Sequence, residues 1–114
     1  MTDGILLYQR LEECTKAKER LSDLLDAYDD ALPQAEHDYQ TTRYERYLLL
    51  LERYGTTTAR EIVRGEPEVA ELRMCRDRLR CKRQTAGREL VWLTGEQGLI
   101  RDEMAREYGR SFNQ

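Results

Sequence analysis

The stretch LLYQRLEECTKAKERLSDLLDAYDDALPQAEHDY, residues 6–39, decides the fold. Apolar side chains recur in it at alternating steps of four and three residues, and Lys18 is the clear polar break. Such heptad spacing, sustained over more than four heptads, is typical of a helix that packs along a seam, as in a coiled coil. The positions of the stripe are Leu7, Leu11, Cys14, Lys18, Leu21, Leu25, Tyr28, Leu32, Ala35 and Tyr39.

Pro33 lies inside this stripe. Proline in a helix interior removes a hydrogen bond and clashes with the preceding turn, so we expect a kink or a break near Pro33. The apolar pattern keeps its phase across the proline and continues to Tyr54, where Gly55 supplies a C-terminal stop. The sequence therefore predicts a first helix over about residues 4–54.

Residues 55–66 predict a corner. Thr58 followed by Glu61 matches a capping box and indicates a short helix over residues 59–64, closed by Gly65. Pro67 suits the first turn of a last helix, predicted over residues 67–108, and residues 109–114 are predicted to form a disordered tail. The stripe of the last helix is Val69, Leu72, Cys75 or Arg76, Leu79, Arg83, Ala86, Leu90, Leu93, Gln97, Ile100 and Met104.

Gly87, Gly95 and Gly98 weaken the last helix by up to about 1 kcal/mol each relative to alanine. Two interpretations stay open. Either the helix is frayed or broken near residues 94–98, or the small residues let another helix approach closely.

These elements predict an all-α protein with one domain over residues 1–108, a long antiparallel helical hairpin with a short corner helix. Two helices bury one stripe each and leave other apolar side chains uncovered. We therefore expect the chain to assemble as a homo-oligomer, a helical bundle or coiled coil. The apolar side chains off the seams are Leu6, Tyr8, Leu24, Leu49, Leu50 and Trp92.

Composition and motifs argue against several classes of function. Charged residues make up 36% of the chain, and no apolar run approaches a membrane span, so we expect a cytoplasmic protein without a leader or membrane contact. Neither a P-loop nor a GxGxxG motif nor a nucleophile elbow is present, and His37 is the single histidine. We expect no enzyme, no metal and no cofactor, with Cys14, Cys75 and Cys81 as reduced thiols.

Charge is distributed unevenly along the chain. Residues 1–40 hold ten acids and four bases, whereas residues 41–90 hold eight acids and twelve bases. Arginine forks suit phosphate, helix N-termini attract anions, and a tyrosine ring can stack on a base. The corner and the start of the last helix are thus a candidate ligand-binding site, comprising Tyr54, Thr57, Thr58, Arg60, Arg64, Arg73 and Arg76.

A structural interpretation of the same residues stays open. The arginines can pair with the acidic first helix, across the hairpin or between subunits, and the threonines can simply cap the turn. Tyr39, Tyr44 and Tyr47, at the end of the first helix, can be seam residues or stacking surfaces. A binding pocket requires arginines that converge with unused donors, whereas internal pairing requires an acid opposite each.

The stretch YGTTTAREIVRGEPEVAELRMCRD, residues 54–77, resembles a family of small helical accessory proteins of tailed phages and prophages. The resemblance implies an accessory protein in the host cell cytoplasm rather than a virion shell component, and it carries over no catalytic residue. Its matching residues are Gly55, Thr58, Ala59, Ile62, Arg64–Gly65, Val69–Ala70, Leu72 and Arg76–Asp77.

Residues and resemblance together favour a non-enzymatic anti-defence binding protein. It would sequester a nucleotide-derived immune signal or inhibit a host defence protein, so its partners would be copies of itself and a phosphate-bearing small molecule or host protein. The alternative is a structural or adaptor accessory of phage DNA replication or recombination. Direct nucleic-acid binding is less expected because the pI is about 5.3. A purely structural coiled-coil oligomer is a third possibility.

Overall fold

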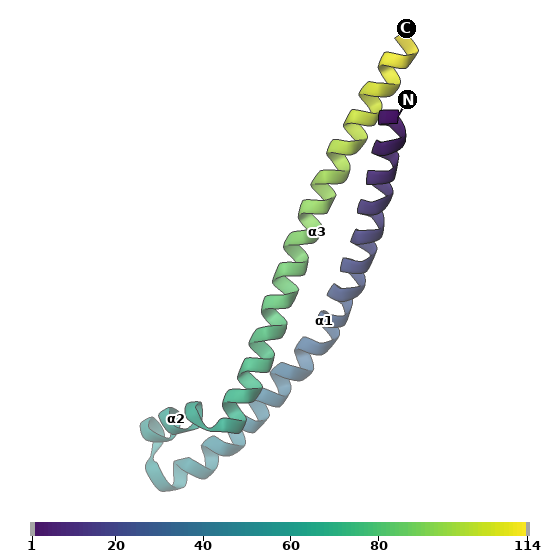
Figure 1. Cartoon of the computed structure of the whole chain (residues 1–114). Coiled ribbons are helices and arrows are strands. Elements are labelled where there is room, and N and C mark those ends of the chain that lie inside the picture. Colours follow the sequence, from purple (N-terminus) through teal and green to yellow (C-terminus); the bar gives the residue numbers. More distant parts are fainter. Residues whose placement is uncertain (1, 114) are drawn as a thin grey trace. The chain divides into compact units, whose positions relative to one another are not determined.

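The structure is a computed structural model that describes residues 2–113, with side chains described for residues 4–109. It contains helix α1 (Thr2–Tyr54), helix α2 (Thr56–Gly65) and helix α3 (Pro67–Asn113) (Figure 1). Between residues 2 and 113, only Gly55 and Glu66 lie outside a helix. The prediction of an all-α protein is confirmed.

The chain divides into two compact units. Unit 1 consists of Met1–Asp26 and Gln84–Gln114, and unit 2 consists of Ala27–Arg83. Helices α1 and α3 contribute to both units, whereas α2 belongs to unit 2.

The stripe predicted for α1 is the face that the helix buries. All ten of its positions are buried or half-buried, including Lys18. For one seam position of α3, the sequence left open whether Cys75 or Arg76 occupies it. Arg76 is half-buried and Cys75 is exposed, so the position belongs to Arg76. Arg83 departs from the predicted stripe, because it is exposed and reaches an acid at the surface.

In unit 1, a polar layer interrupts the apolar seam. Lys18 Nζ donates to Gln97 Oε1 at 3.0 Å, and Gln97 Nε2 donates to Thr15 Oγ1 at 2.9 Å. The Thr15 hydroxyl in turn donates to the carbonyl of Leu11. The polar break of α1 thus meets the polar seam residue of α3, which fixes how the two helices align. Around this layer, the buried apolar residues are Leu7, Leu21, Ala86 and Ile100.

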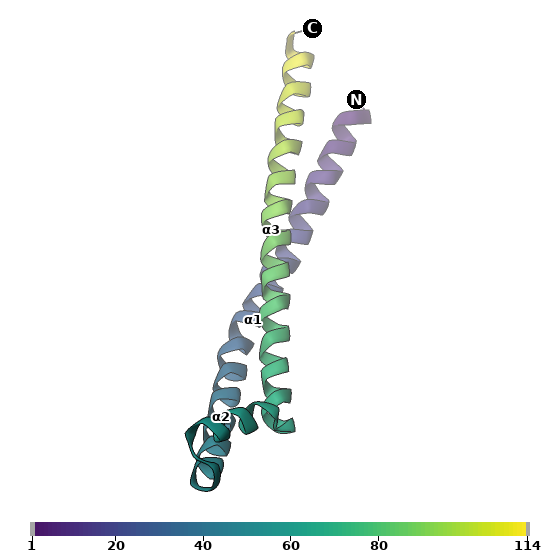
Figure 2. The ribbon, with the colours of Figure 1, turned by 90° about the vertical axis from the view of Figure 1, so that its left-hand side faces the viewer.

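In unit 2, α1 and α3 run antiparallel and α2 packs on both. Ion pairs join Asp29 to Arg83 and Glu36 to Arg80, so the later residue of α1 pairs with the earlier residue of α3, as in an antiparallel pair. Figure 2 shows α2 lying across the end of α1 and beside the start of α3. Tyr39, Val63 and Val69 form the buried centre, one from each helix, and Tyr47, Leu50 and Leu72 pack around them.

The corner differs from the prediction because Gly55 serves both helices. Its N–H donates to the Leu51 carbonyl at the end of α1, and its own carbonyl accepts from Ala59 at the start of α2. Gly55 has a φ of 80° and a ψ of 174°, a conformation open to glycine alone. Helix α2 therefore begins at Thr56 rather than residue 59, and it has no side-chain cap. The predicted Thr58–Glu61 capping box is wrong, because Thr58 already lies within the first turn.

The exit of α2 also differs by one residue. Gly65 belongs to α2, and Glu66 is the linking residue, with an extended backbone at φ −64° and ψ 133°. Its N–H donates to Val63, and its carbonyl accepts from Ala70 in the first turn of α3.

The long helices are continuous at three places where the sequence predicted a break or a disordered end, or left a break open. Of the kink or break predicted near Pro33, the break is wrong, because α1 is continuous through this residue, and the kink stays a prediction. Pro33 is exposed, and the half-buried stripe on both sides of it packs against the rest of the chain. Helix α3 is continuous through residues 94–98, where its inner face stays packed. It also extends to Asn113, so residues 109–113 are helical instead of a disordered tail; Gln114 lies outside the described residues.

Candidate functional site

A groove in unit 2 is lined by arginine and tyrosine side chains from α1 and α2. Its volume is about 460 Å³, within the usual range of small-molecule sites. The α1 residues recur at helical spacing and so share one face, as do the α2 residues. We call this feature the arginine–tyrosine groove; it is lined by Tyr39, Arg43, Tyr44, Tyr47, Arg60, Val63 and Arg64.

The base of the groove is buried and its walls are polar. Tyr39 and Val63 are buried in the centre of unit 2, at 8% and 3% exposure. Arg43, Arg60 and Arg64 are exposed, and so is Tyr44. A buried base held by packing can position exposed side chains without further support.

The guanidinium groups of the groove have no acidic partner. Among the described side chains, Arg60 and Arg64 form no hydrogen bond or ion pair. Arg43 donates to Gln40 Oε1 at 2.8 Å, and its guanidinium lies 5.8 Å from the Tyr39 ring centroid. Since an amide and a ring leave its charge uncompensated, three positive charges face one open groove.

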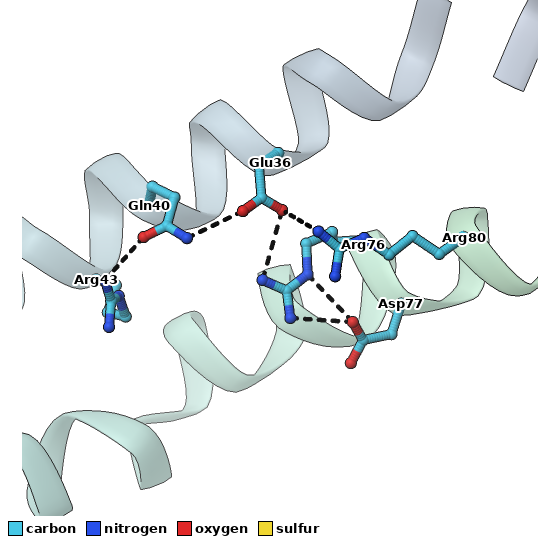
Figure 3. Close-up of polar contacts among 6 residues, drawn as sticks. All are labelled: Glu36, Gln40, Arg43, Arg76, Asp77 and Arg80. Atoms are coloured by element: carbon cyan, nitrogen blue, oxygen red, sulfur yellow. Dashed lines mark hydrogen bonds and ion pairs between the residues drawn. The ribbon is translucent and has the colours of Figure 1, made fainter. Parts of the chain in front are cut away.

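Next to the groove, a chain of polar contacts ties α1 to α3. Glu36 accepts from Gln40 and pairs with Arg76 at 3.4 Å and Arg80 at 3.2 Å (Figure 3). The hydrogen bond from Gln40, together with the positive charges of Arg76 and Arg80, lowers the pKa of Glu36 below its ordinary value of 4.5 despite some desolvation. Gln40 also accepts from Arg43, so this chain reaches the groove and orients one of its arginines.

Arg76 is held firmly in this network. Its side chain is 14% exposed, pairs with Asp77 at 3.0 Å, and lies 4.4 Å from the Tyr39 ring centroid. Burial would lower the pKa of Arg76, but the hydrogen bond with Asp77 and the charges of Asp77 and Glu36 raise it. Arg76 therefore packs on Tyr39, and its guanidinium is engaged by Glu36 and Asp77 instead of lining the groove.

Other arginines of unit 2 match acids within the chain. Arg46 pairs with Glu68 at 2.7 Å and with Glu66 at 3.7 Å. Arg83 pairs with Asp29, and the hydrogen bond with that carboxylate raises the pKa of Arg83. The basic stretch of the sequence thus splits into two groups. Arg76, Arg80 and Arg83 form ion pairs with acidic residues of α1, whereas Arg60 and Arg64 do not.

The structure brings two of the seven candidate residues, Arg60 and Arg64, into the groove. Arg73 instead donates to the Arg64 carbonyl at 3.2 Å, near the end of α2. Tyr54 lies under Arg53, 5.3 Å from ring centroid to guanidinium carbon. Thr57 and Thr58 are exposed in the first turn of α2 and do not line the groove.

Sequence reasoning left Arg43 and Val63 out of the site and treated Tyr39, Tyr44 and Tyr47 only as neighbouring rings. The pattern YQTTRYERY, residues 39–47, contains the information, because Tyr39, Arg43 and Tyr47 follow one another at intervals of four. That spacing puts an arginine between two rings on one helix face.

The described residues offer neither a metal site nor a membrane-spanning helix. No cluster of three or more His, Cys, Asp or Glu side chains there could hold a metal ion, and the three cysteines are free thiols. Within the same residues, no helix is both long and apolar enough to cross a membrane. No protein-family model matches the chain, and neither curated proteins nor solved structures provide a match.

Proposed function

We propose that the protein is a non-enzymatic binding protein whose arginine–tyrosine groove takes a nucleotide-derived ligand. The observation that carries the proposal is the convergence of Arg43, Arg60 and Arg64, without an opposing carboxylate, beside three tyrosine rings. Guanidinium groups bind phosphate through paired hydrogen bonds, and a tyrosine face stacks on a base. A nucleotide offers both chemistries within one molecule.

The lining of the groove favours binding over catalysis. Its seven residues are tyrosines, arginines and one valine, without a carboxylate, imidazole or thiol. General acid–base catalysis near neutral pH most often uses such groups. Retention of a ligand, rather than its conversion, is the activity we propose.

The resemblance of residues 54–77 to phage accessory proteins supplies the biological setting of the proposal. Two of the groove residues, Arg60 and Arg64, lie in that stretch. We propose that the protein acts against host defence in the host cytoplasm by sequestering a nucleotide-derived immune signal. Inhibition of a host defence protein through the same basic surface is the second form of this proposal.

Calorimetric titration of the full chain with cyclic dinucleotides and ADP-ribose derivatives tests the proposal. Replacing both guanidinium groups in Arg60→Ala/Arg64→Ala should weaken binding by about a hundredfold, since hydrogen bonds to charged groups contribute about 1.5–3 kcal/mol each. Arg78→Ala, an exposed arginine of α3 outside the groove, is the matched control and should bind like the parent.

Absence of binding to every nucleotide at high protein concentration would contradict the small-molecule proposal. The same titration with single-stranded oligonucleotides separates the adaptor alternative. Tighter binding to a strand than to any mononucleotide or dinucleotide, lost on raising the salt, would favour a DNA-side accessory instead.

A further inference from the structure

Helix α3 has an exposed face in unit 1 that the described chain leaves largely uncovered. Val91, Trp92 and Leu99 are 74%, 63% and 60% exposed, although they are large apolar side chains. Gly95 and Gly98 lie among them, and a Cβ atom built at either glycine meets nothing within 4 Å. The face is thus apolar, interrupted by two small residues, and open.

This face lies opposite the seam with α1. At about 100° per residue, Val91, Trp92, Gly98 and Leu99 fall within about 60° of Gly95 around the helix. The packed residues Leu93, Gln97 and Ile100 fall on the other side. Trp92 stands at one edge of the face, where its ring also borders a groove with Glu13 and Cys14 of α1. Packing inside unit 1 explains neither Val91 and Leu99 nor the glycines of this face.

The residues before Gly95 on this face are complementary to those at the same distance after it. Arg88 and Asp102 lie seven residues to either side of Gly95, Val91 and Leu99 lie four, and Trp92 and Gly98 lie three. An antiparallel second copy centred on Gly95 would place each residue of these pairs against the other. Opposite charges, two apolar side chains, and a large ring above a glycine would then meet.

The geometry points to a symmetric dimer in which α3 packs antiparallel on α3 of a second copy, with the two-fold axis beside Gly95. A two-fold interface uses the same patch on both subunits, and self-complementarity is its requirement. Arg88 and Asp102 have no partner among the described side chains, so both are available to the second copy. The absent Cβ of Gly98 leaves room for the Trp92 ring of the second copy.

A charge exchange tests this register without altering the apolar surface. Arg88→Asp sets Asp against Asp102 twice in the dimer, and Asp102→Arg sets Arg against Arg88 twice. Each should weaken dimerisation by about tenfold in sedimentation equilibrium, since two favourable pairs become two unfavourable ones. Arg88→Asp/Asp102→Arg restores opposite charges and should recover most of the loss. A double variant no better than either single variant would overturn the register.

Cross-linking tests the position of the axis. In a chain whose Cys14, Cys75 and Cys81 are replaced by serine, Gly95→Cys should form a disulfide-linked dimer under mild oxidation. Glu89→Cys is the matched control, because Glu89 is exposed on the same helix but about 120° away from Gly95. Equal cross-linking of the two variants would overturn the proposal, as would cross-linking of the control alone.

The unaltered chain provides an independent measurement, because Trp92 is its only tryptophan. Dimerisation should shield the ring, so its emission should shift to the blue and iodide quenching should fall as protein concentration rises. A monomer at every concentration, with emission that does not change, would contradict the dimer.

Discussion

Gln97 is a buried polar side chain of unit 1, and its hydrogen bonds decide what its replacement does. Its exposure is 4%, and it accepts from Lys18 while donating to Thr15. A buried polar group deprived of its partner costs free energy, whereas removal of both partners can be neutral. We therefore expect the polar layer to set the alignment of α1 and α3 more than it raises the free energy of unfolding.

Gln97→Leu should lower the free energy of unfolding by about 1–3 kcal/mol, because the half-buried ammonium of Lys18 loses its acceptor. Lys18→Leu/Gln97→Leu should regain most of that loss. Urea unfolding followed by circular dichroism measures both variants. A double variant that is less stable than Gln97→Leu would show that the layer itself stabilises the unit.

Glu36 is the residue whose charge should make unit 2 sensitive to acid. Since its folded-state pKa lies below its ordinary value, the ion pairs contribute stability above that value, and the contribution is lost as pH falls through the folded-state pKa. Glu36→Gln should therefore be less stable than the parent at neutral pH. The difference should vanish in acid, where Glu36 is protonated in both folded and unfolded chains. A difference in unfolding midpoint that is independent of pH would contradict this account.

At the scale of elements, the corner depends on the backbone of Gly55. With a φ of 80°, it is the one residue with positive φ among those described, and open space surrounds it. A side chain there would meet no neighbour, so any cost of substitution comes from the backbone alone.

Gly55→Ala should lower the free energy of unfolding by about 1–3 kcal/mol, the usual cost of a side chain in that backbone region. Gly65→Ala is the matched control, because Gly65 lies in α2 with an ordinary φ and equally open surroundings. Alanine should stabilise that helix by up to about 1 kcal/mol. Thermal unfolding of both variants checks the prediction, and an equal effect at the two glycines would contradict it.

Helix periodicity made much of the fold predictable. The four-three stripe of α1 depends only on local spacing, and every position in it is shielded in the structure. The ends of α2 were less predictable, because Gly55 ends one helix and begins the next through a backbone conformation that the Thr58–Glu61 pattern does not encode. Similarly, Pro33 in the sequence indicates a lost backbone hydrogen bond in α1. It does not indicate the packing on both sides of the proline that offsets this cost.

The candidate site was predictable only in part, because it depends on which arginines lack an acid. Arg60, Arg64 and Arg76 are alike in a basic stretch of sequence. Only the placement of Glu36 opposite Arg76, and of α2 against the tyrosines of α1, separates them. Arg43 precedes the corner on α1, and its place in the groove depends on how α2 packs against that helix.

At the scale of the whole molecule, the proposed ligand site and the proposed dimer face belong to different units. The arginine–tyrosine groove lies in unit 2, and the face around Gly95 lies in unit 1. Arg88→Asp should therefore weaken dimerisation without changing the affinity for a nucleotide measured by calorimetry. A parallel loss of both would show that the ligand site is completed by the second copy.

The central claim is that the arginine–tyrosine groove holds a phosphate-bearing ligand with an aromatic ring. Nuclear magnetic resonance titration of the full chain with the best-binding nucleotide tests it most directly, by following the side-chain signals of Arg60, Arg64, Tyr44 and Tyr47. The account predicts saturable shifts at these four residues, with Arg78 unchanged. Shifts confined to residues outside the groove, or no shift at saturating nucleotide, would contradict it.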